Sequence, residues 1–131
     1  MESLFTKIIK GEIPSYKIAE TDQFYAFLDI RPLAEGHTLV IPKQEIDYVF
    51  DIDDDILAGL MVFSKKIARA IKMVIPCKKV GIAVIGLEVP HAHIHLIPMN
   101  KVGDLNFSRP HLEISSTRMA EIAGDIAQFI E

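Results

Sequence analysis

Three of the chain's five histidines lie at alternate positions in the stretch PHAHIHLIP, at residues 91, 93 and 95. Side chains on a β-strand point to opposite faces in turn, so His91, His93 and His95 are expected to share one face of a strand. The apolar residues Ala92 and Ile94 would then face a hydrophobic core on the other side. This row of three imidazoles is the feature of the sequence best suited to chemistry.

The row has three interpretations. The histidines could be buried side chains with satisfied hydrogen bonds and no further role. They could bind a transition metal, because neutral imidazole is a common ligand of zinc, copper and nickel, with Glu88 as the nearest acidic candidate. The central imidazole could instead attack a phosphoryl group and hold it covalently, while its neighbours fix its tautomer and place donors near the developing charge. The pattern alone leaves these interpretations open.

Periodicity and turn signals predict the elements that must position the row. Apolar residues at helical spacing predict a short N-terminal helix ending near Gly11, a long helix over 53–75, and a closing helix after Ser116. In the long helix, Met61 and Met73 are expected to be packing residues. β-rich runs predict about five strands, of which the first two form a hairpin and the fourth is buried. These runs are residues 15–21, 24–30, 37–42, 79–86 and the histidine row. The order of elements predicts an α+β domain built on an antiparallel sheet.

Length and composition narrow the class of protein. The chain has 131 residues, 50% of them hydrophobic and 24% charged, which predicts a single domain over residues 1–131. A formal charge of −4 and the lack of a polybasic run argue against a nucleic-acid or membrane partner. The single cysteine, Cys77, excludes an internal disulfide, and no apolar run approaches the roughly 18 residues of a membrane span. Without a secretory signal pattern at its start, the protein is expected to be cytoplasmic.

The motif HAHIHLI matches the signature His-x-His-x-His followed by two apolar residues, and the chain resembles the histidine triad (HIT) family. Two further blocks, LFTKIIKGEIPSYKI and AFLDIRPLAEGHTLVIPK, are similar to the opening helix and the nucleotide-pocket segment of that family. The three blocks cover almost the whole chain in the family's order. The sequence looks closest to the Hint-like nucleotide-binding branch, which implies the HIT-like fold.

The resemblance assigns expected roles to the histidines. His93 would be the nucleophile that takes the nucleotidyl group, His95 would contact the phosphate, and His91 would support the orientation of the row. Gly86 in the preceding turn permits a close backbone approach to a phosphate. Glu88 could act as the catalytic acid, or it could be an exposed turn residue.

The resemblance also implies a nucleotide pocket. Asp29 would accept hydrogen bonds from the ribose hydroxyls, although a plain turn residue at the end of a strand is an alternative for this position. Phe27 and Ile30 would sandwich the base. The rest of the apolar wall would come from Phe5, Ile8 and Ile13.

Two departures from the family pattern stand out. Many bacterial relatives carry a Cys-x-x-Cys motif and a later histidine that hold a structural zinc together with the first histidine of the row. Ser3, Thr6 and Glu45 occupy the corresponding positions here, so no zinc is expected. The turn before the row usually reads Gly-Gln-Ser or similar, whereas this chain has Leu87 and Glu88 after the glycine.

The resemblance therefore implies a purine nucleotide-binding hydrolase or transferase. It would split a nucleoside 5′-phosphate from a leaving group, such as the amine of a nucleoside phosphoramidate, through a covalent nucleotidyl-His93. No cofactor is expected. The protein is expected to form a homodimer. Two alternatives stay open: a non-catalytic nucleotide-binding or interaction module, which the altered turn favours, and a metal-binding protein that uses the histidine row.

Overall fold

A five-stranded antiparallel sheet forms the centre of the molecule, with strand order β1-β2-β3-β5-β4. The strands are β1 (Lys17–Glu20), β2 (Phe24–Leu28), β3 (Thr38–Pro42), β4 (Lys79–Ala83) and β5 (Ile94–Met99). The structure is a computed structural model that describes residues 1–130, so Glu131 at the end of the predicted domain lies outside the described residues. The predicted hairpin is confirmed as β1 and β2, and the predicted α+β class is confirmed as well.

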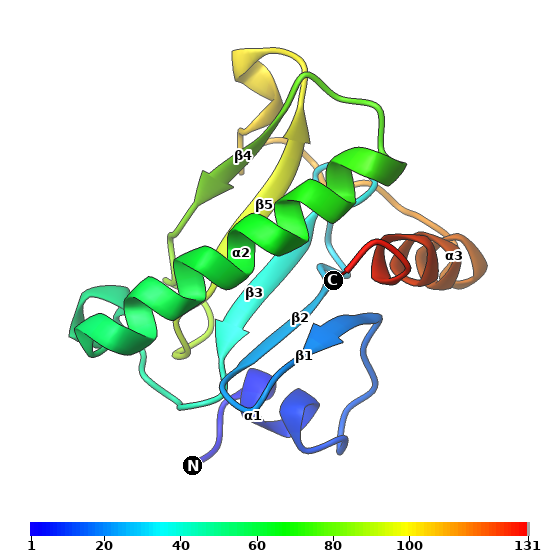
Figure 1. Cartoon of the computed structure of the whole chain (residues 1–131). Helices are drawn as coiled ribbons and strands as arrows, with labels where there is room; N and C mark the ends of the chain where they lie inside the picture. The colour runs from blue at the N-terminus through cyan, green and yellow to red at the C-terminus, as the bar shows by residue number, and fades with distance from the viewer. Residues whose placement is uncertain (131) are drawn as a thin grey trace.

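Three helices accompany the sheet: α1 (Leu4–Ile9), α2 (Asp54–Val74) and α3 (Ser116–Ala127). Two single 3-10 turns, η1 (Val49–Asp51) and η2 (Val102–Asp104), lie in the connections. Figure 1 shows α2 crossing one face of the sheet, with α3 beside it near the C-terminus. Within residues 1–130, none of the helices has both the length and the apolar character needed to cross a membrane.

Residues alternate between the two faces of the sheet as strand geometry requires. The face under α2 and α3 carries the main core, to which the sheet contributes Phe24, Ala26, Leu28, Val40, Ile94 and Leu96. The opposite face carries a smaller cluster under α1, made of Phe5, Ile8, Tyr25, Phe27, Leu39 and Ile41. His95 pairs with Leu39 and therefore lies on this second face. The histidine row thus faces α1, on the side away from the main core.

Two predicted strands differ from the structure. The predicted buried strand over 79–86 is wrong, because β4 ends at Ala83 and lies at the edge of the sheet, where Ile82 is 47% exposed. The histidine row is not wholly a strand either, because β5 begins at Ile94. If the register of β3 and β5 continued, Pro42 would lie opposite Ala92, and proline has no N–H to donate.

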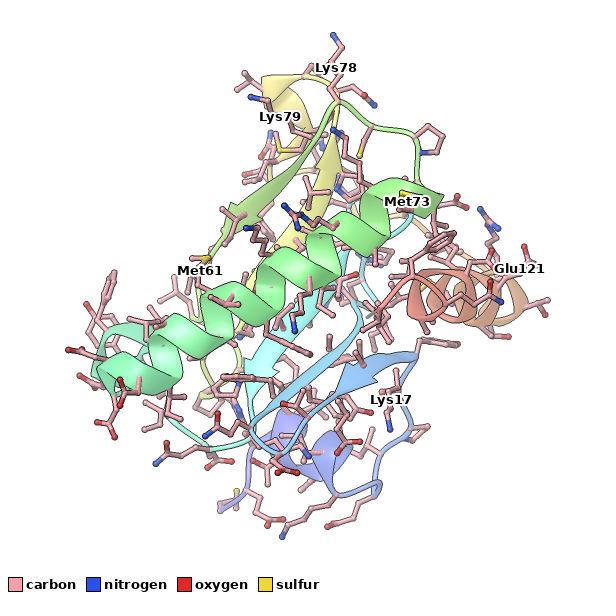
Figure 2. All side chains as sticks on the ribbon, in the orientation of Figure 1. Lys17, Met61, Met73, Lys78, Lys79 and Glu121 are labelled. Carbon is pink, nitrogen blue, oxygen red and sulfur yellow. The ribbon has the colours of Figure 1, made fainter. Side chains whose placement is uncertain are left out.

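The surface of α2 also corrects an expectation. Met61 and Met73, predicted as packing residues, are 51% and 66% exposed, and Figure 2 shows them on the outer side of the helix. The helix buries a different set of side chains: Leu60, Phe63, Ser64, Ile67, Ala70 and Ile71. The helical spacing was therefore correct, and the two methionines lie off the buried stripe.

Gly36, in the turn two residues before β3, is expected to contribute to stability. Its φ of +89° lies in the left-handed region, and a Cβ there would lie 2.8 Å from Cγ1 of Ile75. Because both the backbone conformation and the space favour glycine, Gly36→Ala should lower the free energy of unfolding by about 1–3 kcal/mol. Urea unfolding of the purified protein measures this change.

Gly124 in α3 provides the matched control. It is helical and exposed, and a Cβ there would meet nothing within 4 Å. Gly124→Ala should raise the free energy of unfolding by about 0.5–1 kcal/mol, because alanine is the better helix former. A Gly36→Ala protein as stable as the parent would contradict this account of the turn.

Candidate active site

A pocket of about 510 Å³ opens on the α1 side of the sheet, over the histidine row. Its walls come from the start of α1, the segment after β2, the turn after β4, the row itself and the segment after η2. The lining residues are Leu4, Phe5, Asp29, Ile30, Arg31, Leu33, His37, Ile85, Gly86, Leu87, Glu88, Val89, His93, His95, Phe107, Arg109 and His111. Segments from across the chain thus converge on two of the three histidines in the row.

The imidazole of His93 is held in one orientation. Its Nδ1 lies 2.8 Å from the backbone carbonyl oxygen of His91, which can only accept a hydrogen bond. Nδ1 therefore carries the proton, and Nε2 keeps its lone pair. The ring is 7% exposed and has the edge-on ring of Phe5 5.0 Å away between centroids. This is the tautomer that a nitrogen nucleophile needs, with the free lone pair on a side chain that lines the pocket.

His95 is oriented through a fourth histidine, His37, which lies just before β3. The N–H of Leu33 donates to Nδ1 of His37 over 3.0 Å, so the proton of His37 is on Nε2. That Nε2 lies 3.0 Å from Nδ1 of His95 and donates to it. The remaining proton of His95 is therefore on Nε2, which makes this ring a hydrogen-bond donor toward an anion in the pocket.

Burial favours the neutral form of three histidines around His93, namely His37, His91 and His95. Desolvation lowers the pKa of His37 from 6.5 to about 4 and the pKa of His95 from 6.5 to about 4. Burial also lowers the pKa of His91, whose side chain is fully buried. The hydrogen-bond directions inferred above for His37 and His95 require neutral rings, and pKa values of about 4 keep both of these rings neutral at neutral pH.

Asp29 lies directly after β2, where its carboxylate lines the pocket. Its Oδ1 accepts a hydrogen bond from the N–H of Arg31 over 2.8 Å, and its Oδ2 lies 3.5 Å from Nε2 of His37. The side chain is 17% exposed, so the carboxylate is accessible without being free to rotate widely. This position suits the predicted ribose contact, which stays a prediction.

The predicted apolar wall lies in two layers. Phe5 and Ile30 line the pocket, and Ile30 is 71% exposed. Phe27 and Ile8 are buried behind them, with the Phe27 ring 5.5 Å from that of Phe5 in an edge-on arrangement. Ile13 is partly buried and packs against the same cluster. Their predicted base contacts stay predictions, and Phe27 would act mainly by supporting Phe5.

The turn after β4 forms one rim of the pocket. Gly86 has a φ of +68°, a conformation that glycine adopts without strain, and its missing side chain leaves the backbone accessible. Glu88 is exposed and lines the same rim. Its predicted role as an acid stays a prediction.

Several pocket residues were not singled out from the sequence, and four of them lie close to His95 or bring polar or aromatic side chains to the pocket wall. His37 stands alone at the start of a strand, and its relation to His95 depends on the pairing of β3 with β5. The other three, Phe107, Arg109 and His111, lie in an irregular segment without periodicity, so no sequence signal placed them here. The Phe107 ring lies 4.8 Å from that of His95, and Arg109 donates to the carbonyl oxygen of Asp104 over 3.0 Å.

One group in the pocket has spacing suitable for a metal ion. Ligand atoms of Asp29, His37 and His95 all lie within 4.8 Å of one another. However, both nitrogens of His37 are engaged, one by Leu33 and one by His95. A metal at this place would have to displace one of these hydrogen bonds, so the arrangement fits a donor chain better than a metal centre.

The comparisons with known proteins agree with this site. Residues 10–102 match the family model described as the HIT domain. An adenosine 5′-monophosphoramidase of Saccharomyces cerevisiae is 46% identical over 96 residues, which is 72% of this chain and 61% of that protein, less than two thirds of its length. An adenosine 5′-monophosphoramidase of Schizosaccharomyces pombe is 34% identical over 134 residues, covering 100% of each chain.

Solved structures show the same fold. A HIT-like protein from Bartonella henselae, described as involved in cell-cycle regulation, superposes with a TM-score of 0.83 at 30% identity over 98% of this chain and 96% of that one. A zinc-bound histidine triad family protein from Mycobacterium smegmatis superposes with a TM-score of 0.81 at 29% identity over 98% and 95% of the two chains. The chain therefore belongs to the histidine triad (HIT) family, as the pattern HAHIHLI predicted.

Proposed function

We propose that this protein is a purine nucleotide-binding hydrolase or transferase that cleaves nucleoside 5′-phosphoramidates or similar compounds through a covalent nucleotidyl-His93. The observation that carries the proposal is the hydrogen bond of 2.8 Å from Nδ1 of His93 to the carbonyl oxygen of His91, which leaves Nε2 as the nucleophile. The names of two similar yeast proteins, both adenosine 5′-monophosphoramidases, support this substrate class.

The first step forms a bond between Nε2 of His93 and the phosphorus of the substrate, and it breaks the bond from phosphorus to the leaving amine. The amine takes up a proton as it departs, and Glu88 on the pocket rim is our candidate for supplying it. His93 becomes a phosphorylated imidazolium, whose Nδ1–H stays on the carbonyl oxygen of His91. The Nε2–H of His95 stabilises the charge on the phosphoryl oxygens.

The second step is attack by water on the nucleotidyl-His93. The bond from phosphorus to Nε2 breaks, the mononucleotide leaves, a proton passes to solvent, and His93 returns to its neutral form. No metal takes part in this scheme, since imidazoles and backbone N–H groups supply the donors. In a transferase reaction, another nucleophile would take the place of water.

A non-catalytic nucleotide-binding module is the main alternative, because Leu87 and Glu88 replace the usual turn and Glu88 brings a carboxylate to a phosphate pocket. Turnover separates the two functions. Binding of a mononucleotide without cleavage of any phosphoramidate would favour the module.

We further propose that the protein is a homodimer that associates through β4. This strand lies at the edge of the sheet, and unpaired edges are places where chains join. Apolar side chains surround it: Ile82 and Val84 are 47% and 41% exposed, and Met61 and Val62 on α2 are 51% and 58% exposed. Figure 2 shows Met61 on the part of α2 that borders β4.

Sedimentation equilibrium tests the homodimer. The parent protein should have twice the mass of the chain, and Ile82→Glu should yield a monomer because the carboxylate would be buried at the joint. Phe129→Glu is the control, since Phe129 is 45% exposed in the turn after α3, and α3 contacts β1 at the opposite edge of the sheet. A monomeric parent, or a dimeric Ile82→Glu variant, would contradict the proposal.

His93→Ala and Asp29→Ala should separate chemistry from binding. His93→Ala should abolish turnover of adenosine and guanosine phosphoramidates and prevent the formation of any covalent nucleotidyl-protein, while mononucleotide affinity changes little.

Asp29→Ala should weaken ribonucleotide binding by about 1–3 kcal/mol, the cost of losing charged hydrogen bonds, and should weaken binding of a 2′,3′-dideoxy analogue far less. Calorimetry and mass spectrometry of trapped protein measure these effects.

Other patterns of loss would refute these roles. Near-normal turnover by His93→Ala would exclude it as the nucleophile. Equal losses of the two ligands in Asp29→Ala would make Asp29 a structural residue. His91→Ala and His95→Ala should retain a residual rate, because these residues position and stabilise rather than form the bond.

The buried histidines should make stability depend on pH. The folded pKa values of His37 and His95 are about 4, below the ordinary value of 6.5, so the unfolded chain takes up protons between these pH values that the folded chain does not. The free energy of unfolding should therefore be full above about pH 6.5 and fall as the pH decreases toward 4, by up to about 3 kcal/mol for each histidine. Urea unfolding at pH 7.5, 6.5, 5.5 and 4.5 measures the slope.

His37→Gln should flatten this slope, because it removes one of the buried histidines whose pKa is lowered. Comparison of each protein with its own stability at the highest pH corrects for the effect of the substitution itself. Equal slopes in the parent and the variant would show that His37 is not the group that resists protonation.

A further inference from the structure

Four polar side chains join the start of α1 to the histidine row: Ser3, Thr6, Glu45 and His91, here called the α1 clamp. The Oγ of Ser3 lies 2.9 Å from Nδ1 of His91. One carboxylate oxygen of Glu45 lies 2.6 Å from the backbone nitrogen of Ser3 and 2.7 Å from the hydroxyl of Thr6. The clamp therefore connects α1, the loop after β3 and the segment before β5.

The direction of each hydrogen bond in the clamp follows from its partners. The carbonyl oxygen of Pro42 lies 2.7 Å from Nε2 of His91 and can only accept, so Nε2 carries the proton of the ring. Nδ1 of His91 must then accept from the hydroxyl of Ser3. The same hydroxyl oxygen accepts from the N–H of Thr6 over 3.0 Å, as the N-cap of α1. Both nitrogens of His91 and the hydroxyl of Ser3 are thus engaged.

A structural zinc does not fit this set of side chains. Structural zinc sites use thiolates and imidazoles, whereas Ser3 and Thr6 offer neutral hydroxyls. Hydrogen bonds also lower the pKa of Glu45 to about 2, chiefly the one from the hydroxyl of Thr6. That carboxylate is already satisfied by protein donors. In this chain, hydrogen bonds of the clamp take the positions that the resemblance assigns to zinc ligands in related proteins.

The clamp reaches the proposed nucleophile through one residue. His91 is 0% exposed, and its ring is fixed at both nitrogens, while its backbone carbonyl oxygen accepts the hydrogen bond from Nδ1 of His93. Phe5, in α1, contacts the rings of both His91 and His93, at 5.8 and 5.0 Å between centroids. A shift of α1 or of the His91 ring would therefore move the group that holds the tautomer of His93.

We propose that hydrogen bonds of the α1 clamp hold α1, the loop after β3 and the histidine row together in place of a structural zinc. We further propose that Ser3 is a positioning residue for the nucleophile. Its hydroxyl proton fixes the ring of His91, and His91 in turn holds His93 with Nε2 free. The effect of Ser3 on turnover rests on the proposed function. Its effect on the two histidine rings does not.

Ser3→Ala tests the positioning role. This variant should lower kcat by about 10- to 100-fold, the usual loss when a buried partner that orients an active-site histidine is removed, with KM changed less than twofold. Ser3→Thr keeps the hydroxyl and should restore at least half of kcat.

Ser115→Ala is the matched control. Ser115 is the N-cap of α3, its hydroxyl accepts a hydrogen bond from the N–H of Arg118 over 3.1 Å, and it does not line the pocket. It should leave kcat unchanged. If Ser3→Ala does not fold, Ser3→Gly takes its place, since glycine is tolerated at an N-cap but has no hydroxyl.

Nitrogen-15 NMR of the histidine rings supplies the readout that does not depend on activity. In the parent, His91 and His93 should each show a single tautomer, with the proton on Nε2 of His91 and on Nδ1 of His93. In Ser3→Ala the Nδ1 signal of His91, which loses its hydrogen-bond donor, and the ring signals of His93 should shift, and in Ser115→Ala neither ring should change. If the parent protein does not cleave phosphoramidates, but Ser3→Ala shows these spectral changes, the proposed function would be refuted and the clamp supported. Unchanged spectra in Ser3→Ala, or a kcat equal to that of Ser115→Ala in an active parent, would overturn the clamp.

Discussion

The hydrogen bond from Nδ1 of His93 to the carbonyl oxygen of His91 is the interaction on which the site depends, and it requires a break in the sheet. A carbonyl inside a regular ladder would be engaged by the neighbouring strand. Here β3 ends at Pro42, and the N–H of Ala92 donates instead to the carbonyl oxygen of Ile46 over 2.7 Å. Because pairing stops before Ile94, the carbonyl of His91 is available to orient a side chain.

Desolvation determines the electrostatic character of the site. The rings of His37, His91 and His95 are buried beside apolar and aromatic side chains, and burial lowers the pKa of each. A row of imidazolium ions would attract a phosphate more strongly, but it would have no lone pair with which to attack it. The buried rings of His37, His91 and His95 therefore act as oriented hydrogen-bond donors and acceptors without positive charge. Arg31 and Arg109 on the pocket walls supply cations nearby.

The fold and the row could be predicted from sequence because both depend on local periodicity. Alternation placed Ala92 and Ile94 in the core and His95 on the opposite face, and helical spacing located all three helices. The sequence could not indicate that Pro42 would end the ladder at Ile94, since that depends on which strands pair and in which register. His37 and Arg109 were missed for the same reason, because each joins the site only through contacts between segments far apart in the chain.

The three histidines of the row are held from two sides, and the difference explains why the middle one is suited to react. His91 is fixed from α1 by Ser3 and from β3 by Pro42. His95 is fixed from the other side by His37, which is itself fixed by Leu33. His93 and His95 are each held through Nδ1 alone, but Nδ1 of His95 accepts a hydrogen bond and Nδ1 of His93 donates one. The Nε2 of His95 therefore carries a proton, and His93 alone of the three has a lone pair that no protein group occupies. The arrangement of its neighbours therefore assigns the reactive role to His93, and the sequence spacing alone could not have distinguished it from the other two.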